Sequence, residues 1–531
     1  MESQSRRGLL KGAVAVAAAF TGPSVLLTEA ATQSAPSKTY SSGSPRVFYA
    51  SQIPDVSLDC DLNTGKKIGG GTATDNTEAF NRILAMATHE NPVTLILDGA
   101  SVISGIEIPK LGHASILGLG WDTGFYVKSG SNADAIHNGG PRAAIPSDPA
   151  SIGIALPPSE NRGSNVRFAD FRINGNRGDG HNGNSNTGRR RGSEQAWYFG
   201  INLMNMENIH IDHVFFYNIA AYNIRLSDCG YATITACKFD SPFHELNQDG
   251  VHLDGGCNDI TISDCFFYNL DDDSIALNAP EGYGGYIRNV QVTNCVFENC
   301  RSLMRIYSAV EGGSQPVSGV VVSNCHGTFS SSGFVLGLGE AGKVVSGLPD
   351  TILDVTFSNC TLTTPWFAQV TNNFGSLKFN GCTWIAPKEA KAFVELSASV
   401  SSLAINGCSI YRTTEGNGPA YLFSGDSPVG TITINGFSID DQFGHTFAPV
   451  PHLITQTGKV GRLIINALDL TNVAVFAKSL EPFHSIAGPG VLSTGVEFPD
   501  AAIADGTLYL SATTHLPSIK ITGVVKTLTT S

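Results

Sequence analysis

The sequence has few charged residues and few helix-like patterns. Only 15% of its 531 residues are Asp, Glu, Lys or Arg, whereas glycine occurs 58 times. After the N-terminal region, no segment is apolar over the roughly 20 residues that a membrane-spanning helix needs. The sequence also has no CxxC pair, no nucleotide-binding loop, no zinc motif and no nucleophilic Ser or Cys constellation. Membrane-spanning, nucleotide-dependent and zinc-dependent classes therefore have no support in the sequence.

The first 31 residues have the pattern of an export signal. Arg6 and Arg7 precede Lys11 and a short apolar run, AVAVAAAF, and Ala30 and Ala31 lie near the expected cleavage point. Paired arginines before a short apolar segment are typical of twin-arginine signals. The alternative is a basic N-terminus without a targeting role. We predict a signal peptide over residues 1–31, a periplasmic or secreted location and no membrane association after signal cleavage.

The chain is acidic, with a net charge of −13. Residues 1–30 carry three cations (Arg6, Arg7, Lys11) and two anions (Glu2, Glu29), so the remainder has a net charge of −14. An acidic surface disfavours nucleic acids and anionic membranes as partners, because like charges repel. It also disfavours a strongly polyanionic substrate.

Eleven cysteines in an exported protein would ordinarily suggest disulfides. Their number is odd, however, and the twin-arginine route exports chains that have already folded in a reducing compartment. We therefore predict that most of these thiols are free and buried. A metal site formed by them is disfavoured, because structural zinc sites usually contain CxxC pairs.

One segment has the pattern of a helix, ATDNTEAFNRILAMA. Asp75 followed three residues later by Glu78 has the spacing of a capping box. Ala79, Ile83 and Ala87 form an apolar face together with Phe80 and Leu84. We predict a helix near residues 76–88.

A loosely repeated segment recurs along most of the chain. Its clearest copies, such as ITISDCFF, VQVTNCVF and VTFSNCTL, each contain an alternating strand and then a polar pair. The steps between copies are 22 to 35 residues, with one of 43, and the equivalent position is held by Phe171, Val214, Cys237, Cys265, Cys295, Cys325, Cys360, Cys382, Cys408, Phe437 and Leu468. This period predicts an all-β right-handed parallel β-helix with one repeat in each coil. Its coils stack about 4.8 Å apart, so the cysteines would form an internal ladder.

The repeats also suggest the domain organisation. We predict that residues 45–485 form the β-helix as one continuous catalytic domain. A solenoid needs caps over its apolar ends and open strand edges. The helix near residues 76–88 would cover the N-terminal end. Residues 486–531 depart from the register of the repeats, and we predict that they form strands that cap the C-terminal end.

Two acidic segments lie about one coil apart, NQDGVHLDGG and DDDSIALN. Asp249 and Asp272 are separated by 23 residues, so they would lie on neighbouring coils, one above the other, on one face. Asp273 would share that face if the chain bends at LDDDS, because adjacent strand residues otherwise point to opposite faces. Like charges at close range raise the pKa of at least one carboxyl group. A cluster of this kind supplies the acid and the base that glycoside hydrolysis needs.

Two other interpretations of this cluster are open. Asp and Asn are common in β-helix turns, so the three aspartates could be a solvated corner. Clustered carboxylates also suit a calcium ion. We expect catalysis, and we predict no bound metal and no cofactor.

Further polar residues lie near the proposed face. Strand alternation would place His252 and Asp254 on the face of Asp249, although a lone histidine is more often a structural hydrogen-bonding group. Asn278 follows the Asp pair and would bind a sugar hydroxyl. Residues 174–200 form a long polar insertion in which Trp197 could stack on a sugar ring, unless the segment is a solvated loop.

The segments NQDGVH, DDDSIALN and MRIYS resemble, in the same order, the N-T-D-G, G-D-D-x-x-A and R-I-K signatures of polygalacturonase-type glycoside hydrolases (family 28). The early stretch through ILGLGWDTGF is similar to pectate-lyase-like β-helix proteins. The resemblance implies an inverting reaction with three aspartates: Asp272 as general acid, Asp249 and Asp273 as the groups that hold and activate water. By the same resemblance Arg305 would bind the sugar, and we also assign Asn247, which opens the first motif, to substrate binding.

Two departures from that family bear on the substrate. The G-H-G motif is absent, since the corresponding region contains only GYGGYI. The lysine of R-I-K, which pairs with the substrate carboxylate, is replaced by Tyr307, which we also assign to substrate binding. We therefore predict a neutral glycan, which would place the chain nearer to dextranase-like or α-galactosidase-like β-helix enzymes.

The sequence predicts an inverting glycoside hydrolase with a carbohydrate substrate. A calcium-dependent polysaccharide lyase or uronate epimerase is a second hypothesis. A third is a glycan-binding β-helix protein without catalytic activity, which would need no paired acids on adjacent coils.

Overall fold

The computed structural model describes most of the chain beyond the N-terminal segment. All described residues belong to one compact unit, Ser42–Ser531. They are residues 46–110, 112–131, 133–138, 162–177, 198–242, 248–279, 285–308, 317–337, 352–413, 421–442, 447, 449–469, 473, 477–478, 482–488, 497–505 and 507–528. The predicted signal peptide lies outside them.

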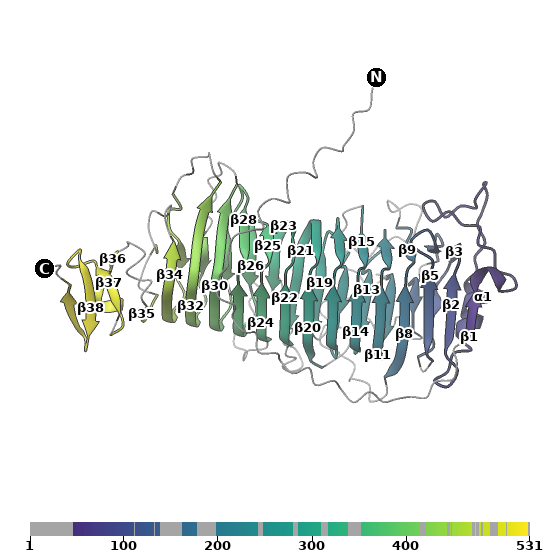
Figure 1. Cartoon of the computed structure of the whole chain (residues 1–531), viewed down its shortest axis with the longest axis horizontal. Helices are drawn as coiled ribbons and strands as arrows, with labels where there is room; N and C mark the ends of the chain where they lie inside the picture. Colours follow the sequence, from purple (N-terminus) through teal and green to yellow (C-terminus); the bar gives the residue numbers. More distant parts are fainter. Residues whose placement is uncertain are drawn as a thin grey trace, which may run out of the picture. The chain divides into compact units, whose positions relative to one another are not determined.

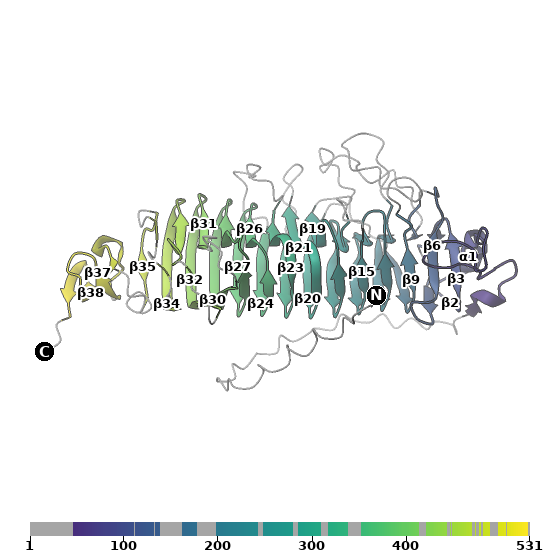
Figure 2. The same ribbon diagram turned by 90° about the horizontal axis from the view of Figure 1, so that it is seen from above.

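The chain winds into a right-handed parallel β-helix, as the repeats predict. Each strand pairs in parallel with the equivalent strand of the next coil, and these pairings define three columns of strands. Figure 1 shows the strands following one another along the long axis. Figure 2 shows the same succession of strands from above. The first column consists of β1 (Arg46–Tyr49), β2 (Val93–Leu97), β5 (Ala114–Gly118), β8 (Gly163–Ala169), β11 (Met206–Asp212), β14 (Gly230–Thr235), β17 (Asn258–Ser263), β20 (Ile287–Thr293), β22 (Val317–Ser323), β24 (Ile352–Ser358), β27 (Phe374–Asn380), β30 (Val400–Arg412), β32 (Val429–Asp441), β34 (Val460–Asp469) and β35 (Ile486–Ala487).

The other two columns share some long strands that turn a corner. The second consists of β3 (Ala100–Ile103), β6 (Gly124–Val127), β9 (Arg172–Asn174), β12 (Phe215–Tyr217), β15 (Lys238–Asp240), β18 (Phe266–Tyr268), the first parts of β21 (Val296–Ser308) and β23 (His326–Leu336), β25 (Thr361–Thr363), β28 (Thr383–Ala386) and the second parts of β30, β32 and β34. The third consists of β4 (Ile106–Glu107), β7 (Ile136–His137), β10 (Ile201–Met204), β13 (Ile224–Ser227), β16 (Val251–Leu253), β19 (Asp273–Ala279), the second parts of β21 and β23, β26 (Trp366–Val370), β29 (Ala392–Leu396), β31 (Tyr421–Gly425) and β33 (Ile454–Gln456).

The polar pair of each repeat forms the corner between the first and second columns. Its second residue has a positive φ angle in successive coils, as at Asp264 (56°), Asn294 (57°), Asn324 (54°) and Asn359 (53°). Asn, Asp and Gly adopt this left-handed conformation more readily than other residues do. Adjacent corners also bond, since the Asn294 side chain donates to Asp264 at 3.2 Å. The Asn, Asp or Gly before most ladder cysteines therefore suits the turn, although Ala236, before Cys237, adopts the same conformation (φ 50°).

The cysteines of the repeats form the predicted ladder. Cys408 is paired with Phe437, and the residues that follow the other ladder cysteines are in register from coil to coil. All eleven cysteines are free and buried, as the sequence predicts. Hydrogen bonding to Cys360 and burial raise the pKa of the Cys382 thiol to about 12. These thiols therefore act as small apolar side chains of the core.

The predicted helix is present but shorter than expected. It is α1 (Thr77–Leu84), which packs against β2 and β4 near the first coil (Figure 1). Its predicted apolar face is buried in the core. The predicted capping box is wrong, because the N-cap is Asn76 and no side chain caps it. Asp75 instead accepts hydrogen bonds from the Thr77 backbone and hydroxyl.

In the described ranges the 3-10 helices are η1 (Ala50–Gln52) and η5 (Asp500–Ala502). A separate sheet follows the last coil, formed by β36 (Glu497–Phe498), β37 (Leu508–Ser511), β38 (Pro517–Ile521) and β39 (Val524–Thr527). Phe498, Ile503 and Tyr509 are buried in the same apolar cluster as the coils.

No helix in the described part of the chain is long and apolar enough to cross a membrane.

Phe267→Ala should strongly destabilise the coil that precedes the acidic segment. Phe267 is fully buried and stacks on Phe239 and Phe297, with ring centroids 4.6 and 4.8 Å away. Truncating such a ring costs about 3–5 kcal/mol of the free energy of unfolding. Urea unfolding followed by fluorescence or circular dichroism measures it.

The adjacent Phe266→Ala variant is the matched control, because Phe266 points outward and is 42% exposed. It should lose less than about 1 kcal/mol. Equal losses in the two variants would contradict the assignment of inward and outward faces.

Candidate active site

Four strands of the third column carry the candidate site, and their sequences align. They are NIRLS (223–227), GVHLD (250–254), SIALN (274–278) and LMRIY (303–307), in β13, β16, β19 and β21. The apolar positions of each, such as Val251 and Leu253, are fully buried in the core. The intervening positions point away from it, which brings Arg225, His252, Ala276 and Arg305 into one column.

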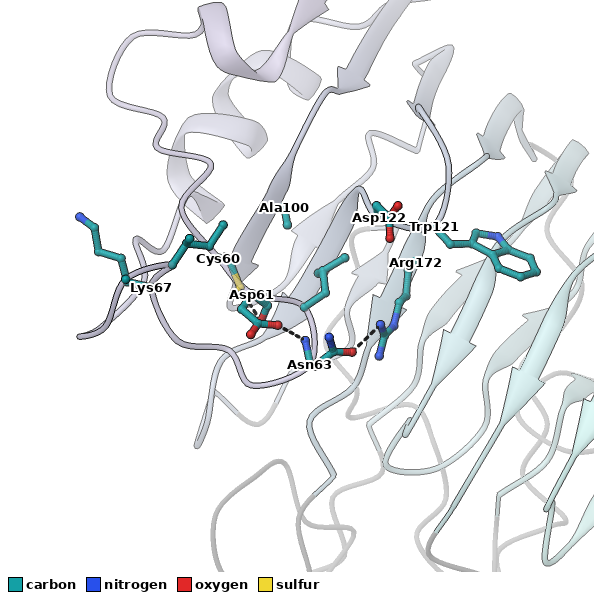
Figure 3. Close-up of a pocket in the computed structure, with 11 residues that line it drawn as sticks. Cys60, Asp61, Asn63, Lys67, Ala100, Trp121, Asp122 and Arg172 are labelled. Atoms are coloured by element: carbon teal, nitrogen blue, oxygen red, sulfur yellow. Dashed lines mark hydrogen bonds between the residues drawn. The ribbon is translucent and has the colours of Figure 1, made fainter. Parts of the chain in front are cut away.

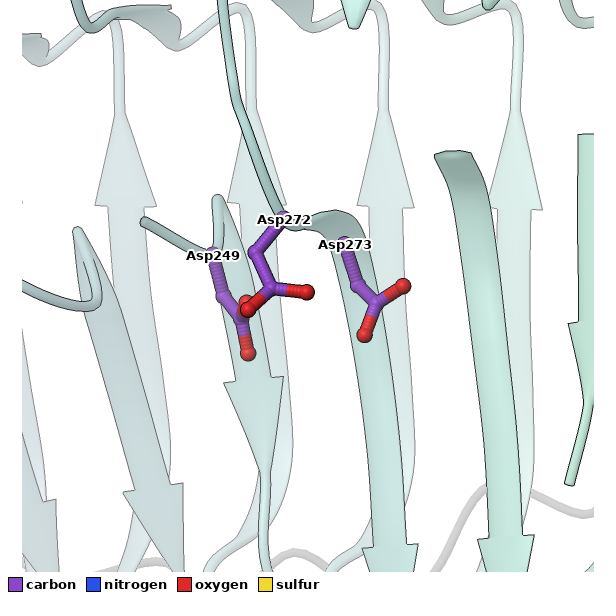
Figure 4. Close-up of side chains that lie close together, drawn as sticks. All are labelled: Asp249, Asp272 and Asp273. Carbon is purple, nitrogen blue, oxygen red and sulfur yellow. The ribbon is translucent and has the colours of Figure 1, made fainter. Parts of the chain in front are cut away.

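The three predicted aspartates meet at the start of β16 and β19. One carboxylate oxygen from each of Asp249, Asp272 and Asp273 lies within 4.8 Å of those of the others. Figure 4 shows the three side chains pointing to the same side of the two strands. Val251 pairs with Ile275, so Asp249 is in register with Asp273. The expectation that Asp272 lies directly above Asp249 is therefore wrong by one residue.

The predicted bend explains why both members of the Asp pair face outward. The chain bends at Asp271 and Asp272, and β19 begins only at Asp273. Strict alternation thus starts after Asp272, and neither side chain has to enter the core.

Asp273 is held by two partners from the next coil. Its Oδ2 lies 2.5 Å from Nε of Arg305, and its Oδ1 accepts a hydrogen bond from Ser302 Oγ at 2.5 Å. Arg305 Nη2 also lies 3.8 Å from Asp272 Oδ1. Although burial opposes the charge of Arg305, the nearby Asp273, Asp272 and Asp249 raise the pKa of its guanidinium. Arg305 is therefore the cation that balances the cluster.

Asp249 has a strongly perturbed pKa. Burial, together with the nearby Asp272 and Asp273, raises its pKa to about 7, while a hydrogen bond with His252 opposes that rise. Asp249 Oδ2 lies 2.6 Å from Nδ1 of His252. A carboxylate with a pKa near 7 is a stronger base than an ordinary aspartate, which suits proton transfer at neutral pH.

His252 shares the outward face with Asp249, but alternation is not the cause. Residues 249 and 252 differ by three, so a regular strand would place them on opposite faces. The bend at Gly250 brings them together. His252 is fully buried, and its ring stacks on Tyr222 at 4.0 Å between centroids. Its Nε2 lies 3.1 Å from Asp254 Oδ1.

Sequence reasoning overlooked Arg225, Tyr222 and Ser302. Arg225 is 1% exposed and forms a close ion pair with Asp254. Aligning NIRLS with GVHLD would have found it, since Arg225 pairs with His252 on the next coil. Tyr222 and Ser302 carry no such motif, because their partners are set by the stacking of coils.

The remaining predicted residues lie on the same face or outside the described residues. Asn278 pairs with Tyr307 on the neighbouring strand, and both are partly exposed. Their position is two residues beyond Ala276 and Arg305, on the outward side. Asn247 and Trp197 lie outside the described part of the chain.

A calcium site is the alternative interpretation of the three aspartates. Their oxygens are close enough to share a cation. Arg305, however, is 2.5 Å from Asp273 and 3.8 Å from Asp272, so a guanidinium already supplies positive charge there. This donor set fits an acid–base cluster better than a dedicated cation site.

A polar concavity lies near the N-terminal coils, with a volume of about 390 Å³. Figure 3 shows Asp61, Asn63 and Arg172 around it, and Arg172 donates a hydrogen bond to Asn63 at 2.9 Å. None of the predicted site residues lines it. It therefore does not compete with the acidic cluster as the site of chemistry.

Residues 163–365 match the sequence model of glycosyl hydrolases family 28. The match includes the three aspartates and Arg305, and it confirms the resemblance that the motifs predict. No curated protein sequence matches the chain significantly.

Several solved structures share the fold. A double mutant of the tailspike protein of E. coli bacteriophage HK620 has 12% identity and a TM-score of 0.53, covering 79% of this chain and 77% of that chain. A tailspike mutant in complex with a hexasaccharide has 11% identity and a TM-score of 0.53, covering 79% and 76%. The tailspike in complex with a pentasaccharide has 12% identity and a TM-score of 0.52, covering 81% and 74%. At these identities the likeness concerns the fold.

Taken together, the family match and the fold support a β-helix protein that degrades or binds glycans. The match to a family of glycosyl hydrolases favours a glycosidase.

Arg305→Gln should destabilise the protein, and more so at pH 8 than at pH 5. Removing the cation leaves the three carboxylates uncompensated, and their repulsion grows as they ionise, with Asp249 titrating near pH 7. Breaking a buried ion pair costs roughly 3–5 kcal/mol. Thermal unfolding at the two pH values measures the difference.

Arg301→Gln on the same strand is the control, because the arginine beside Asp272 and Asp273 is Arg305. It should change the melting temperature little at either pH. A loss in Arg305→Gln that is independent of pH would contradict the electrostatic explanation.

Proposed function

We propose that this protein is an inverting glycoside hydrolase. The observation that carries the proposal is the meeting of Asp249, Asp272 and Asp273 within 4.8 Å on neighbouring coils, beside one balancing arginine. Folding alone gains nothing from three carboxylates at this distance, because like charges repel. The family match over residues 163–365 supports the same conclusion.

The reaction would break the bond between the anomeric carbon and the glycosidic oxygen. Asp272 would protonate the leaving oxygen, while a water attacks the anomeric carbon from the opposite face and loses its proton to Asp249 or Asp273. The Asp272 side chain is 16% exposed, against 5% for each of the other two, so it is the carboxyl group that a glycan reaches most easily. Asp273 is fixed by Arg305 and Ser302, which suits a residue that orients water.

Inversion rests on the resemblance to family 28. Carboxyl groups about 5–5.5 Å apart are typical of retention, and about 6.5–9.5 Å of inversion. The carboxylate oxygens of the cluster lie within 4.8 Å of one another, which is closer to the retaining than to the inverting separation. The anomer of the first product is therefore the measurement that tests inversion. Proton NMR of the fresh reaction mixture identifies that anomer.

A neutral glycan is the proposed substrate. Tyr307 stands where polygalacturonase-type enzymes place a lysine for the substrate carboxylate, and the net charge of the chain is −13. An acidic protein without that cation would bind a polyanion weakly. The phage tailspike structures in complex with oligosaccharides make a binding protein without hydrolysis the second candidate.

We also propose export by the twin-arginine route. The free, buried state of all eleven cysteines is compatible with folding in a reducing compartment before export. Replacing Arg6 and Arg7 by lysine should retain the protein in the cytoplasm, which fractionation would detect.

Asp272→Asn should lower the rate of glycan hydrolysis by at least about 10²-fold, because it removes the proton donor for the leaving oxygen. Reducing-sugar release from a panel of neutral and acidic glycans measures this, with and without EDTA. Asp271→Asn is the matched control, since Asp271 is adjacent in sequence but is not part of the cluster.

Several results would count against hydrolysis. Unsaturated products that absorb in the ultraviolet, or loss of activity with EDTA, would indicate a calcium-dependent lyase. Glycan binding that persists in Asp272→Asn, with no cleavage by the wild type, would indicate a binding protein.

The roles of acid and base can be separated by rescue. Asp272→Asn should regain activity on an aryl glycoside with a good leaving group, because such a group departs without protonation. Asp249→Asn should instead regain cleavage activity when azide is added, because azide replaces the activated water as nucleophile. The opposite pattern of rescue would reverse the assignment.

A further inference from the structure

Beneath the acidic cluster lies a chain of buried ionisable groups that extends away from the proposed point of cleavage. It runs from Asp249 to His252, from His252 to Asp254, and from Asp254 to Arg225. All four side chains are nearly inaccessible, with exposed fractions of 5%, 0%, 0% and 1% respectively. Isolated buried charges are costly, so such a chain persists only if its members compensate one another.

His252 contacts a carboxylate with each ring nitrogen. Nδ1 lies 2.6 Å from Asp249 Oδ2, and Nε2 lies 3.1 Å from Asp254 Oδ1. Both ring nitrogens carry a proton only in the imidazolium form. Two flanking carboxylates therefore favour a positively charged ring.

The far end of the chain is anchored. Asp254 Oδ2 makes a close ion pair with Arg225 and accepts a hydrogen bond from the Ser227 hydroxyl. The Arg225 guanidinium lies over the Phe199 ring, 5.6 Å from its centroid. Phe199 stacks on Tyr222 at 5.2 Å, and Tyr222 stacks on His252 at 4.0 Å. The imidazole is thus held on its face by Tyr222 and at Nδ1 by a hydrogen bond to Asp249, while Nε2 lies at ion-pair distance from Asp254.

We propose that His252 is a positioning residue that, held by Asp254 and Arg225, keeps Asp249 ionised and oriented as the water-activating base. This inference rests on the proposed hydrolase function, because it assigns a role within that reaction. It also gives His252 a different role from direct contact with substrate.

The charges around Asp249 explain why such a residue is needed. Asp272 and Asp273 face it from the start of β19, and both disfavour its ionised form. Arg305 from β21 compensates them, but it lies at 2.5 Å from Asp273 and 3.8 Å from Asp272. Among the described residues, His252 is the cationic group within hydrogen-bonding distance of Asp249 itself. When water attacks, its proton passes to Asp249, and no other reactant is required.

The test compares the pH dependence of kcat/KM for the wild type and His252→Phe on a substrate that the wild type cleaves. Phenylalanine preserves a ring that can stack on Tyr222 but has no N–H group. Loss of the cation should raise the apparent pKa of the acidic limb by about one unit, so activity at pH 6 falls about tenfold and largely recovers at pH 9. His252→Gln, which keeps a neutral N–H donor, should lie between the two.

A uniform loss across the pH range in a folded variant would overturn the proposal, since packing alone would explain it. If His252→Phe does not fold, His252→Gln decides in the same way. Circular dichroism and the melting temperature distinguish folded from unfolded variants.

Nitrogen NMR of the histidine rings provides a measurement that does not depend on activity. The signals of His252 are those lost in His252→Gln. They should report two protonated nitrogens at pH 8, where an ordinary histidine is neutral. A neutral ring at pH 8 would overturn the proposal. Full activity in Asp272→Asn would instead overturn the proposed function and leave the NMR result standing.

Discussion

The in-register stacking of coils is the constraint on which the rest of this structure depends. Backbone hydrogen bonds between parallel strands place each residue directly beside its counterpart one repeat away. Side chains therefore meet in columns of like position. In the core, this stacking produces the cysteine ladder and the Phe239–Phe267–Phe297 stack. On the outward face, the same stacking brings Asp249 beside Asp273, because Val251 pairs with Ile275.

A column of like charges is unstable unless the neighbouring columns compensate it. Here the compensation alternates along the stack, from Arg225 to Asp254, His252 and Asp249, and then from Asp273 to Arg305. Ala276 occupies the equivalent position between His252 and Arg305, and its short side chain adds no further charge. The negative charge is not fully compensated at Asp249, whose pKa rises to about 7. That imbalance costs stability at neutral pH, and it is also what makes the carboxyl group useful as a base.

Most of the fold could be predicted because β-helices are governed by local patterns. The alternating strands, the positive-φ residue before each cysteine and the spacing of the copies each point to one coil per repeat. The errors were local. The capping box was placed one residue early, since Asn76 rather than Asp75 precedes the helix. The register of the Asp pair was displaced by one residue, because a bend such as that at Asp271 and Asp272 resets the alternation.

The sequence by itself determined the fold class, the free cysteines and the identity of the three clustered aspartates. These follow from repetition and from short motifs, which a linear chain displays directly. Only the tertiary structure decided which carboxylate is buried, which cation serves it and where His252 points. Arg225, Tyr222 and Ser302 each come from a different coil from the acidic residues they contact or support. Their roles depend on the bend at Gly250 and on strand register, which are set by packing between coils rather than by residues adjacent in the chain.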